Sequence, residues 1–398
     1  MQSKQSPLQS AELKFLLASL CRAVHPTSAN TSPPPDLDWG RLLELARRHR
    51  LASLLAWVWD EEEAIPPRVR EELASAFRQA ASGALQKSAD LLRLVGTMES
   101  AGVCALAYKG PALGARLYGS PALRPSADID LLVSPTDLPK ARAVLSELGY
   151  SPMVPLTSEQ ERWWLASECS LDFVREGTRA AADLHWTIVP RHYAIDMSFA
   201  SLWGKRRLIP FGETQLPTLS AEDCLLTLAI HGGKHLWERL IWVCDIARLL
   251  EVEALDWCYL ESRASELGVH RLLWIALRLA RELFRSELPA PIVEHIERDH
   301  KAAALAQSFA AAYDLPSQSS DLARWRLQLE MRERRRDRAR CVCRYATTAG
   351  VIEWNWIRLP RAASRLYPLV RMARLGLSAV GINPTIVPRY SESGGSRA

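Results

Sequence analysis

The chain has 398 residues, of which 48% are apolar and 24% are charged, and its formal net charge is +5. This composition is that of an ordinary globular protein long enough for two or three packed units, and it excludes a low-complexity chain. The eight cysteines include no CxxC pair, which argues against a zinc ribbon, and the absence of any run of 18 apolar residues argues against a membrane-spanning helix.

The first hundred residues are expected to form a helical region. Apolar residues at helical spacing predict helices over 11–23, 39–59 and 69–100, and the stretch 26–37 is polar and Pro-rich, as linkers are. The opening residues lack the apolar core of a secretory signal, so we expect a cytoplasmic protein with reduced thiols.

The most informative stretch follows, VCALAYKGPALGARLYGSPALRPSADIDLLV over residues 103–133. It predicts an apolar strand over 103–108 and a second strand that ends at Val133 and carries Asp128 and Asp130. Side chains two apart on a strand leave the same face, so the two carboxylates should lie close together. Like charges held that close need a cation between them, and a hard divalent ion such as Mg²⁺ is the usual solution.

The residues between these two strands are suited to phosphate. Lys109 and Gly110 follow the first strand, and Pro111 fits the first turn of a helix, whose free N–H groups attract anions. Gly110 would let phosphate approach the backbone closely. Lys109 and Arg124 could bind phosphate as cations, but Lys109 could equally be a surface residue and Arg124 could simply shape the loop.

The rest of the α/β part supplies a third acid. We expect a helix over 135–148 and strands over 150–154, 169–174, 182–189 and 207–211. Asp183 and His185 lie in the third of these strands, on one face by the alternation rule. Asp183 could complete a carboxylate triad, and His185 could line the same site.

A helical bundle is predicted over 218–314, starting from a Ser220 cap. His231 and His235 are four residues apart and should share a helix face. Gly232 stands where a metalloprotease would need glutamate, so a structural role is favoured for these histidines over a protease zinc site. Lys234 and Asp245 could face a nucleotide or pair with each other on the surface.

The positive charge is confined to the last segment, 315–398. Residues 323–398 hold 16 Arg and 5 acids, a balance of +11, which leaves 5 − 11 = −6 for the first 322 residues. Arginines mixed with aromatic and aliphatic residues suit packed helices, an anionic membrane surface or an acidic partner. Because the preceding part is acidic, a nucleic-acid partner is unlikely.

Several of these motifs occur together in a known family. The pattern KG…LYG…LRPSADIDLLV, followed by DLHW, resembles the uncharacterised nucleotidyltransferase family of the polymerase-β-like nucleotidyltransferase superfamily, over about residues 95–250. The superfamily usually has Gly-Ser after its first strand, where this chain has Lys109-Gly110-Pro111.

The resemblance implies an α+β fold, in which a small mixed sheet forms the nucleotidyltransferase core between helical regions. It also implies two-metal chemistry, with Asp128, Asp130 and Asp183 as catalytic metal ligands for Mg²⁺. Lys109, Gly110, Arg124 and His185 would then bind the nucleotide. The expected domains are 1–100, 101–217, 218–314 and 315–398.

Two functions are compatible with this pattern. The first is an enzyme that transfers a nucleoside monophosphate from an NTP to a hydroxyl of a small molecule, peptide or protein. The alternative is a catalytically silent binding or regulatory module of the same fold, docked to a membrane or an acidic partner through its basic tail. The presence of all three acids favours the enzyme.

Overall fold

The computed structural model describes residues 10–28, 31–60, 62–177, 181–315 and 321–379. It divides into two compact units. The core unit comprises residues 1–153, 170–188 and 195–334, and the tail unit comprises 154–169, 189–194 and 335–398. This division differs from the four consecutive domains expected from the sequence, because two internal segments join the C-terminal helices. Residues 1–9 and 391–398, expected to be loose, lie outside the described ranges.

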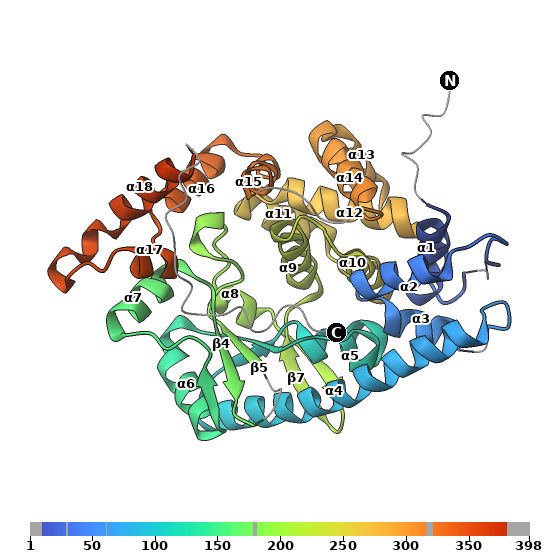
Figure 1. Cartoon of the computed structure of the whole chain (residues 1–398), viewed down its shortest axis with the longest axis horizontal. Helices are drawn as coiled ribbons and strands as arrows, with labels where there is room; N and C mark the ends of the chain where they lie inside the picture. Colours follow the sequence, from blue (N-terminus) through green and yellow to red (C-terminus); the bar gives the residue numbers. More distant parts are fainter. Residues whose placement is uncertain (1–9, 29–30, 61, 178–180, 316–320, 380–398) are drawn as a thin grey trace. The chain divides into compact units, whose positions relative to one another are not determined.

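The core unit has the predicted α+β architecture, with a five-stranded mixed sheet and flanking helices (Figure 1). The strand order is β1-β2-β5-β4-β3, in which β2 and β5 run parallel and all other neighbours run antiparallel. The strands are β1 (Ala105–Ala107), β2 (Ile129–Val133), β3 (Tyr150–Pro152), β4 (Ser170–Arg175) and β5 (Ala181–His185). All five residues of β2 are buried. Because β2 is buried along its whole length, it holds the residues at its start in place.

A separate two-stranded ribbon follows the sheet. It pairs β6 (Arg207–Phe211) with β7 (Thr214–Thr218) in antiparallel register. The sequence predicted β6 but not β7. The predicted strand over 182–189 ends earlier, at His185.

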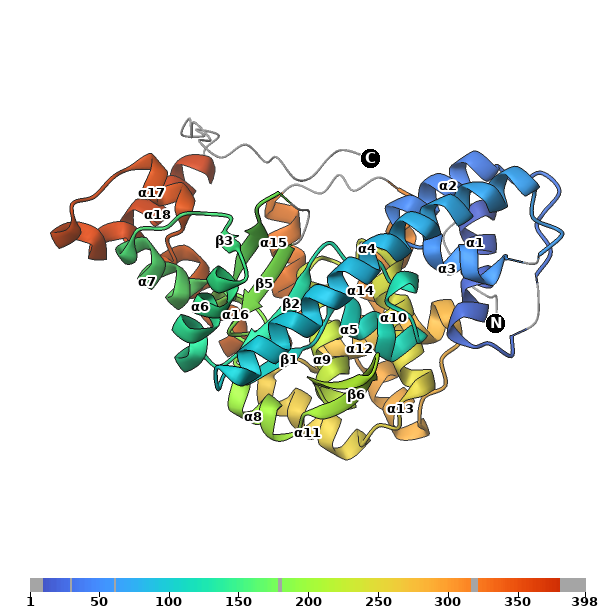
Figure 2. The ribbon, with the colours of Figure 1, turned by 90° about the horizontal axis from the view of Figure 1, so that it is seen from below.

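Helices α4 (Pro67–Ser100), α5 (Gly110–Tyr118) and α6 (Leu138–Glu147) support the sheet. The 34-residue α4 contacts β1, α5 and α6, and Figure 2 shows it running along the sheet. Arg175 of β4 donates two hydrogen bonds to the Asp90 carboxylate of α4, at 2.7 and 3.0 Å. Two parallel bonds between a guanidinium and a carboxylate fix orientation as well as distance, so this contact sets where the helix crosses the strand.

The N-terminal helices differ from the prediction at one point. The single helix expected over 39–59 is divided into α2 (Trp39–Arg48) and α3 (Ala52–Val58). Arg50 between them has φ 59°, in the left-handed region. Glycine normally marks such a break, and here none does, so no local pattern predicts it. Helix α1 (Ala11–Val24) matches its prediction.

The rest of the core unit contains the predicted helical bundle, in which short turns separate successive helices. Leu236 and Trp237, both with positive φ, separate α9 from α10, and Asp299 caps the helix that starts after the break at 298–300. The helices are α8 (Phe199–Gly204), α9 (Ala221–Lys234), α10 (Leu240–Val252), α11 (Trp257–Leu267), α12 (His270–Phe284), α13 (Ala290–Arg298), α14 (His300–Ala312) and α15 (Asp321–Glu330).

The tail unit contains most of the basic C-terminal segment. Its helices are α7 (Ser158–Ser167), α16 (Arg335–Thr347), α17 (Val351–Trp356) and α18 (Tyr367–Ala379), with short 3-10 turns η3 (Arg191–Tyr193) and η4 (Arg361–Leu366). Trp354 and Tyr367 form a buried cluster against which Trp163 and Trp164 pack. The fully buried Glu353 carboxylate pairs with Arg371 and Arg374. Some tail arginines therefore neutralise an internal acid.

No helix within the described residues is long and apolar enough to cross a membrane.

Candidate active site

A polar cavity of about 400 Å³ lies in the core unit at the start of β2. All seven residues that the sequence singled out as site residues line it: Lys109, Gly110, Arg124, Asp128, Asp130, Asp183 and His185. They come from four separate stretches of the chain, and the fold brings these stretches together around one cavity. Their roles are considered below.

Asp130 and Asp183 face each other across the two parallel strands of the sheet. The register pairs Asp130 of β2 directly with Asp183 of β5. Ligand atoms of Asp130, Asp183 and His185 all lie within 4.8 Å of one another. Nε2 of His185 is 3.4 Å from Oδ1 of Asp130 and 3.9 Å from Oδ2 of Asp183. The two acids and the imidazole thus form one compact group of potential ligands.

Asp128 lies just outside this group. It immediately precedes β2, which starts at Ile129, and so it is not the strand residue that the sequence predicted. Its carboxyl still lines the same cavity. Burial and then repulsion from Asp130 raise the pKa of Asp128 to about 6. Asp128 and Asp130 therefore lie close enough to repel each other, although Asp128 is not part of β2.

The ammonium group of Lys109 forms an ion pair with Asp130 and neutralises its negative charge. Its Nζ lies 2.8 Å from Oδ1 of Asp130, and both side chains are largely buried. Burial opposes ionisation of Asp130, but Lys109 and His185 outweigh burial and hold the pKa of Asp130 well below its usual value. Asp130 is therefore ionised at neutral pH.

The pKa of Asp183 is shifted in the opposite direction to that of Asp130. Burial, and then repulsion from Asp172, Asp128 and Asp130, raises the pKa of Asp183 to about 9. Asp172 lies directly opposite Asp183 in the antiparallel β4–β5 register. Asp172 was not among the residues predicted from the sequence, although the alternation in Ser170-Leu-Asp-Phe would have placed it on the polar face of its strand.

Gly110 occupies a position that requires glycine. It starts α5 with φ 57°, and a Cβ built there would lie 3.0 Å from the carbonyl oxygen of Asp128. The backbone at the start of α5 is therefore pressed against the loop that carries the acids. The N-cap residue Lys109 makes no side-chain capping bond, so side-chain capping does not satisfy the first N–H groups of α5.

Arg124 is held by a buried network. Its Nε donates to both carboxylate oxygens of Asp245, at 3.0 and 2.8 Å, and the Tyr118 hydroxyl donates to Oδ1 of Asp245 at 3.1 Å. Asp245 is fully buried. Lys234 lines the cavity instead of pairing with Asp245 on a surface. Because Asp245 engages Nε, the Nη end of Arg124 can point into the cavity.

Three rings form one wall of the cavity. His231 and His235 lie with their centroids 4.7 Å apart, and each ring centroid is 5.3 Å from that of Trp242. Burial and then Lys109 hold the pKa of His231 well below its usual value, and burial and then Lys234 lower the pKa of His235 to about 4. Both imidazoles are neutral at physiological pH.

Several charged residues of this cavity were not predicted from the sequence. Arg50, Glu238 and Arg239 line it as well. With these included, five Lys or Arg side chains and four acids face the cavity. Arg50 gave no signal because it lies at the unpredicted break between α2 and α3. The excess of cations around a core of acids suits a polyanion that carries its own metal ion.

The acids fit a divalent cation by their chemistry and by their electrostatics. Carboxylate oxygens are the preferred ligands of Mg²⁺, and burial together with repulsion among the acids raises the pKa of Asp128 and of Asp183, so a bound cation would favour their ionised, ligating forms. Both ring nitrogens of His185 are buried and make no hydrogen bond with the described protein atoms. An added cation would relieve the repulsion among the acids.

Comparison with known proteins agrees with this geometry. No curated protein matches the chain. The family model described as "Uncharacterised nucleotidyltransferase" matches residues 35–285, which include helices α2–α12, the five-stranded sheet and every site residue named from the sequence. The match covers more than half of the chain, so the protein belongs to this uncharacterised nucleotidyltransferase family.

Proposed function

We propose that the protein is a metal-dependent enzyme that transfers a nucleoside monophosphate from an NTP to a hydroxyl group of an acceptor. The observation that carries this proposal is the direct pairing of Asp130 with Asp183 across two parallel strands, in a cavity also lined by Lys109 and Arg124. Carboxylates would hold the metal, and the surrounding cations would hold the triphosphate.

We assign the metal to Asp128, Asp130 and Asp183, with Mg²⁺ as the expected ion. Bound there, divalent ions would neutralise the triphosphate and polarise the α-phosphate. His185 adjoins the same acids and could contribute a nitrogen ligand, a preference that Mn²⁺ satisfies better than Mg²⁺. Activity should therefore be assayed with Mg²⁺ and with Mn²⁺.

The chain's own residues would position the reactants. Lys109 and the Nη end of Arg124 would contact phosphate oxygens, and the free N–H groups at the start of α5 would bind the terminal phosphates beside Gly110. The acceptor oxygen would form a bond to the α-phosphorus as pyrophosphate leaves. Asp183, ionised once positive charge is bound beside it, would take the hydroxyl proton.

Transfer can be tested before the acceptor is known. Purified protein is incubated with each α-³²P-labelled NTP, Mg²⁺ or Mn²⁺, and a small-molecule or protein extract, and labelled products are counted. We expect label transfer with the parent and with Glu147→Ala, an exposed acid outside the cavity, but none with Asp130→Ala. The proposal also requires metal-dependent NTP binding by calorimetry. Metal-dependent NTP binding without transfer in any extract would favour the silent regulatory module, and equal transfer by Asp130→Ala would refute the site.

A second proposal concerns the basic tail, which we expect to dock to an anionic membrane surface. Six large apolar side chains of the tail unit are exposed: Val342, Ile352, Ile357, Leu366, Leu369 and Met372. Exposed apolar residues among arginines are typical of interfacial helices. We expect co-sedimentation with phosphatidylglycerol vesicles that weakens at high salt and in Leu369→Glu, but not in Leu322→Glu, an exposed leucine of the core unit. Equal sedimentation with neutral vesicles would contradict the proposal.

A further inference from the structure

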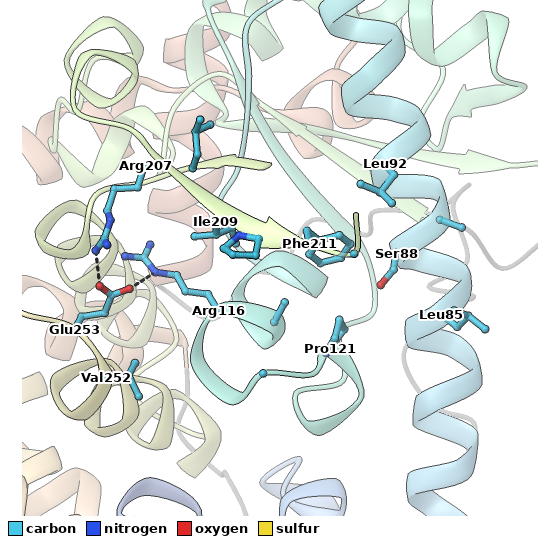
Figure 3. A pocket seen from close by; sticks show the side chains of 16 residues that line it. Leu85, Ser88, Leu92, Arg116, Pro121, Arg207, Ile209, Phe211, Val252 and Glu253 are labelled. Carbon is cyan, nitrogen blue, oxygen red and sulfur yellow. Dashed lines mark hydrogen bonds and ion pairs between the residues drawn. The ribbon is translucent and has the colours of Figure 1, made fainter. Parts of the chain in front are cut away.

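The core unit contains a second, larger cavity that the nucleotide site does not use. It has a volume of about 810 Å³ and is formed by α4, α5, the β6–β7 ribbon and the end of α10. Ligand sites of this size are commonly lined by apolar side chains with a few polar groups at defined positions. Figure 3 shows the same division here, with an ionic cluster on one side and leucines of α4 on the other.

The apolar part is unusual because it leaves large side chains exposed. Leu85 of α4 is 74% exposed, Leu208 of β6 is 59% exposed, and Val252 of α10 is 41% exposed. Single exposed apolar residues are common on protein surfaces, but three from three different elements around one concavity form a patch. Ile209 and Phe211 continue the patch into the cavity (Figure 3). Together they make a slot that a flexible aliphatic chain could fill.

The polar end has an excess of positive charge. The lining residues there are Arg116, Arg207 and Glu253, so one carboxylate faces two guanidinium groups. Nε of Arg116 donates to Oε1 of Glu253 at 2.8 Å, and Arg207 pairs with the other oxygen of Glu253. The end of the cavity therefore carries one unbalanced positive charge.

Arg116 also has a hydrogen-bond donor to spare. Its side chain is only 2% exposed, and its Nη1 donates to the Leu219 carbonyl at 2.8 Å. Its Nη2 is buried without a hydrogen-bond partner among the described residues. Because Nη2 is buried, Arg116 contributes positive charge beside the cavity, and Arg207, whose side chain is 51% exposed, is the guanidinium that an anion in the cavity can contact directly.

We propose that this cavity binds a free anionic amphiphile with a single alkyl chain and a carboxylate head group. The carboxylate would lie at Arg116 and Arg207, and the chain would extend along Ile209 and Phe211 toward Leu85. This proposal does not depend on the nucleotidyltransferase reaction, because none of the acids of the nucleotide site lines the cavity.

The test is calorimetry on the full chain with three probes, keeping dodecanoate below its critical micelle concentration and dodecan-1-ol below its solubility limit. Dodecanoate carries head and chain, dodecan-1-ol carries the chain alone, and butyrate carries the head with a short chain. We expect dodecanoate to bind at least tenfold more tightly than either of the others. Within the carboxylates, affinity should rise by up to about fourfold per added methylene, because each buried CH₂ contributes about 0.8 kcal/mol.

Two substitutions separate the chain contact from the head contact. Leu208→Glu should weaken dodecanoate binding at least tenfold, while Leu322→Glu, at a leucine 77% exposed outside the cavity, should not. Arg207→Gln should reduce the preference for dodecanoate over dodecanol. Equal binding of dodecanoate and dodecanol by the parent would overturn the proposal. So would binding to phosphatidylglycerol vesicles that Leu208→Glu abolishes when free dodecanoate does not bind, because the patch would then be a membrane contact.

Discussion

Removing the carboxylate of Asp245 should destabilise the core unit strongly. Asp245 is fully buried and is the common acceptor for Arg124, at 2.8 and 3.0 Å, and for Tyr118, at 3.1 Å. In Asp245→Ala the Arg124 guanidinium, only 10% exposed, would lose its counter-ion and the Tyr118 hydroxyl would lose its acceptor. Breaking a buried ion pair from one side costs about 3–5 kcal/mol.

The same physics predicts that replacing the whole network costs much less. Burial raises the pKa of Asp245 even with Arg124 beside it, so desolvation consumes much of the energy of the pair. Arg124→Met with Asp245→Leu and Tyr118→Phe removes every group that would be left unpaired. We therefore expect this triple variant to recover most of the stability that Asp245→Ala loses.

Urea denaturation followed by circular dichroism at pH 7.5 measures both effects. The control is Glu294→Ala, which removes an exposed ion pair with Arg298 and should change the free energy of unfolding by less than about 1 kcal/mol. If Asp245→Ala costs no more than this control, the network does not stabilise the fold. A triple variant as unstable as the single one would refute the desolvation reasoning.

Four further predictions follow from the same structure. Burial lowers the pKa of His49 to about 4 from 6.5, so the stability it contributes is complete above pH 6.5 and is lost as the pH falls toward 4. The loss amounts to about 3 kcal/mol, so denaturation at several pH values should show a loss in His49→Gln that is smaller than that of the parent by this amount, since His231 and His235 titrate in both proteins. Gly110→Ala should lower both the melting temperature and the NTP affinity, because the new Cβ would press against the carbonyl oxygen of Asp128. The control is Gly102→Ala, where φ is 71° and the space around the residue is open. It should lower the free energy of unfolding only by the backbone strain of about 1–2 kcal/mol. Equal melting temperatures for these two variants would contradict the close approach. Because burial raises the pKa of Asp183 to about 9, the stability that this residue contributes to the metal-free protein should be lost as the pH rises from about 4 to about 9, so the parent should lose stability relative to Asp183→Asn over that range. Mg²⁺ should stabilise the parent most at the alkaline end, and a Mg²⁺ shift in melting temperature that is independent of pH would count against this. Glu353→Ala, which leaves Arg371 and Arg374 unpaired, should unfold the tail unit at a temperature several degrees lower in a calorimetric scan, and an unchanged scan would exclude a structural role for this acid.

The sequence predicted the parts of the site that depend on local patterns. Apolar, strand-like runs identified the strand of Asp130 and that of Asp183, and Gly110 stood out because it lies between a strand and a helix start marked by Pro111, where backbone N–H groups can bind phosphate. The family match confirms the nucleotidyltransferase assignment. The specific roles of the acids remain a proposal.

The parts that the sequence missed depend on contacts between distant segments. Arg50 turns the chain in a left-handed conformation that a non-glycine residue adopts only when packing requires it. The tail unit combines helices after Arg335 with the segment 154–169, a pairing that no local pattern contains. The cavity wall of His231, His235 and Trp242 likewise depends on the turn at 236–237, where two residues with positive φ bring α10 back toward α9.

The parallel pairing of β2 with β5 has a consequence for how the protein folds. Asp130 and Asp183 are adjacent in space but 53 residues apart in sequence (183 − 130), so they meet only after a long loop has closed. Loop closure carries an entropic cost, and parallel pairing between distant strands is slow to form. During synthesis, β1, α5 and β2 can fold while Asp183 is still inside the ribosome. We therefore expect nascent chains to lack metal-dependent NTP binding until β5 has emerged.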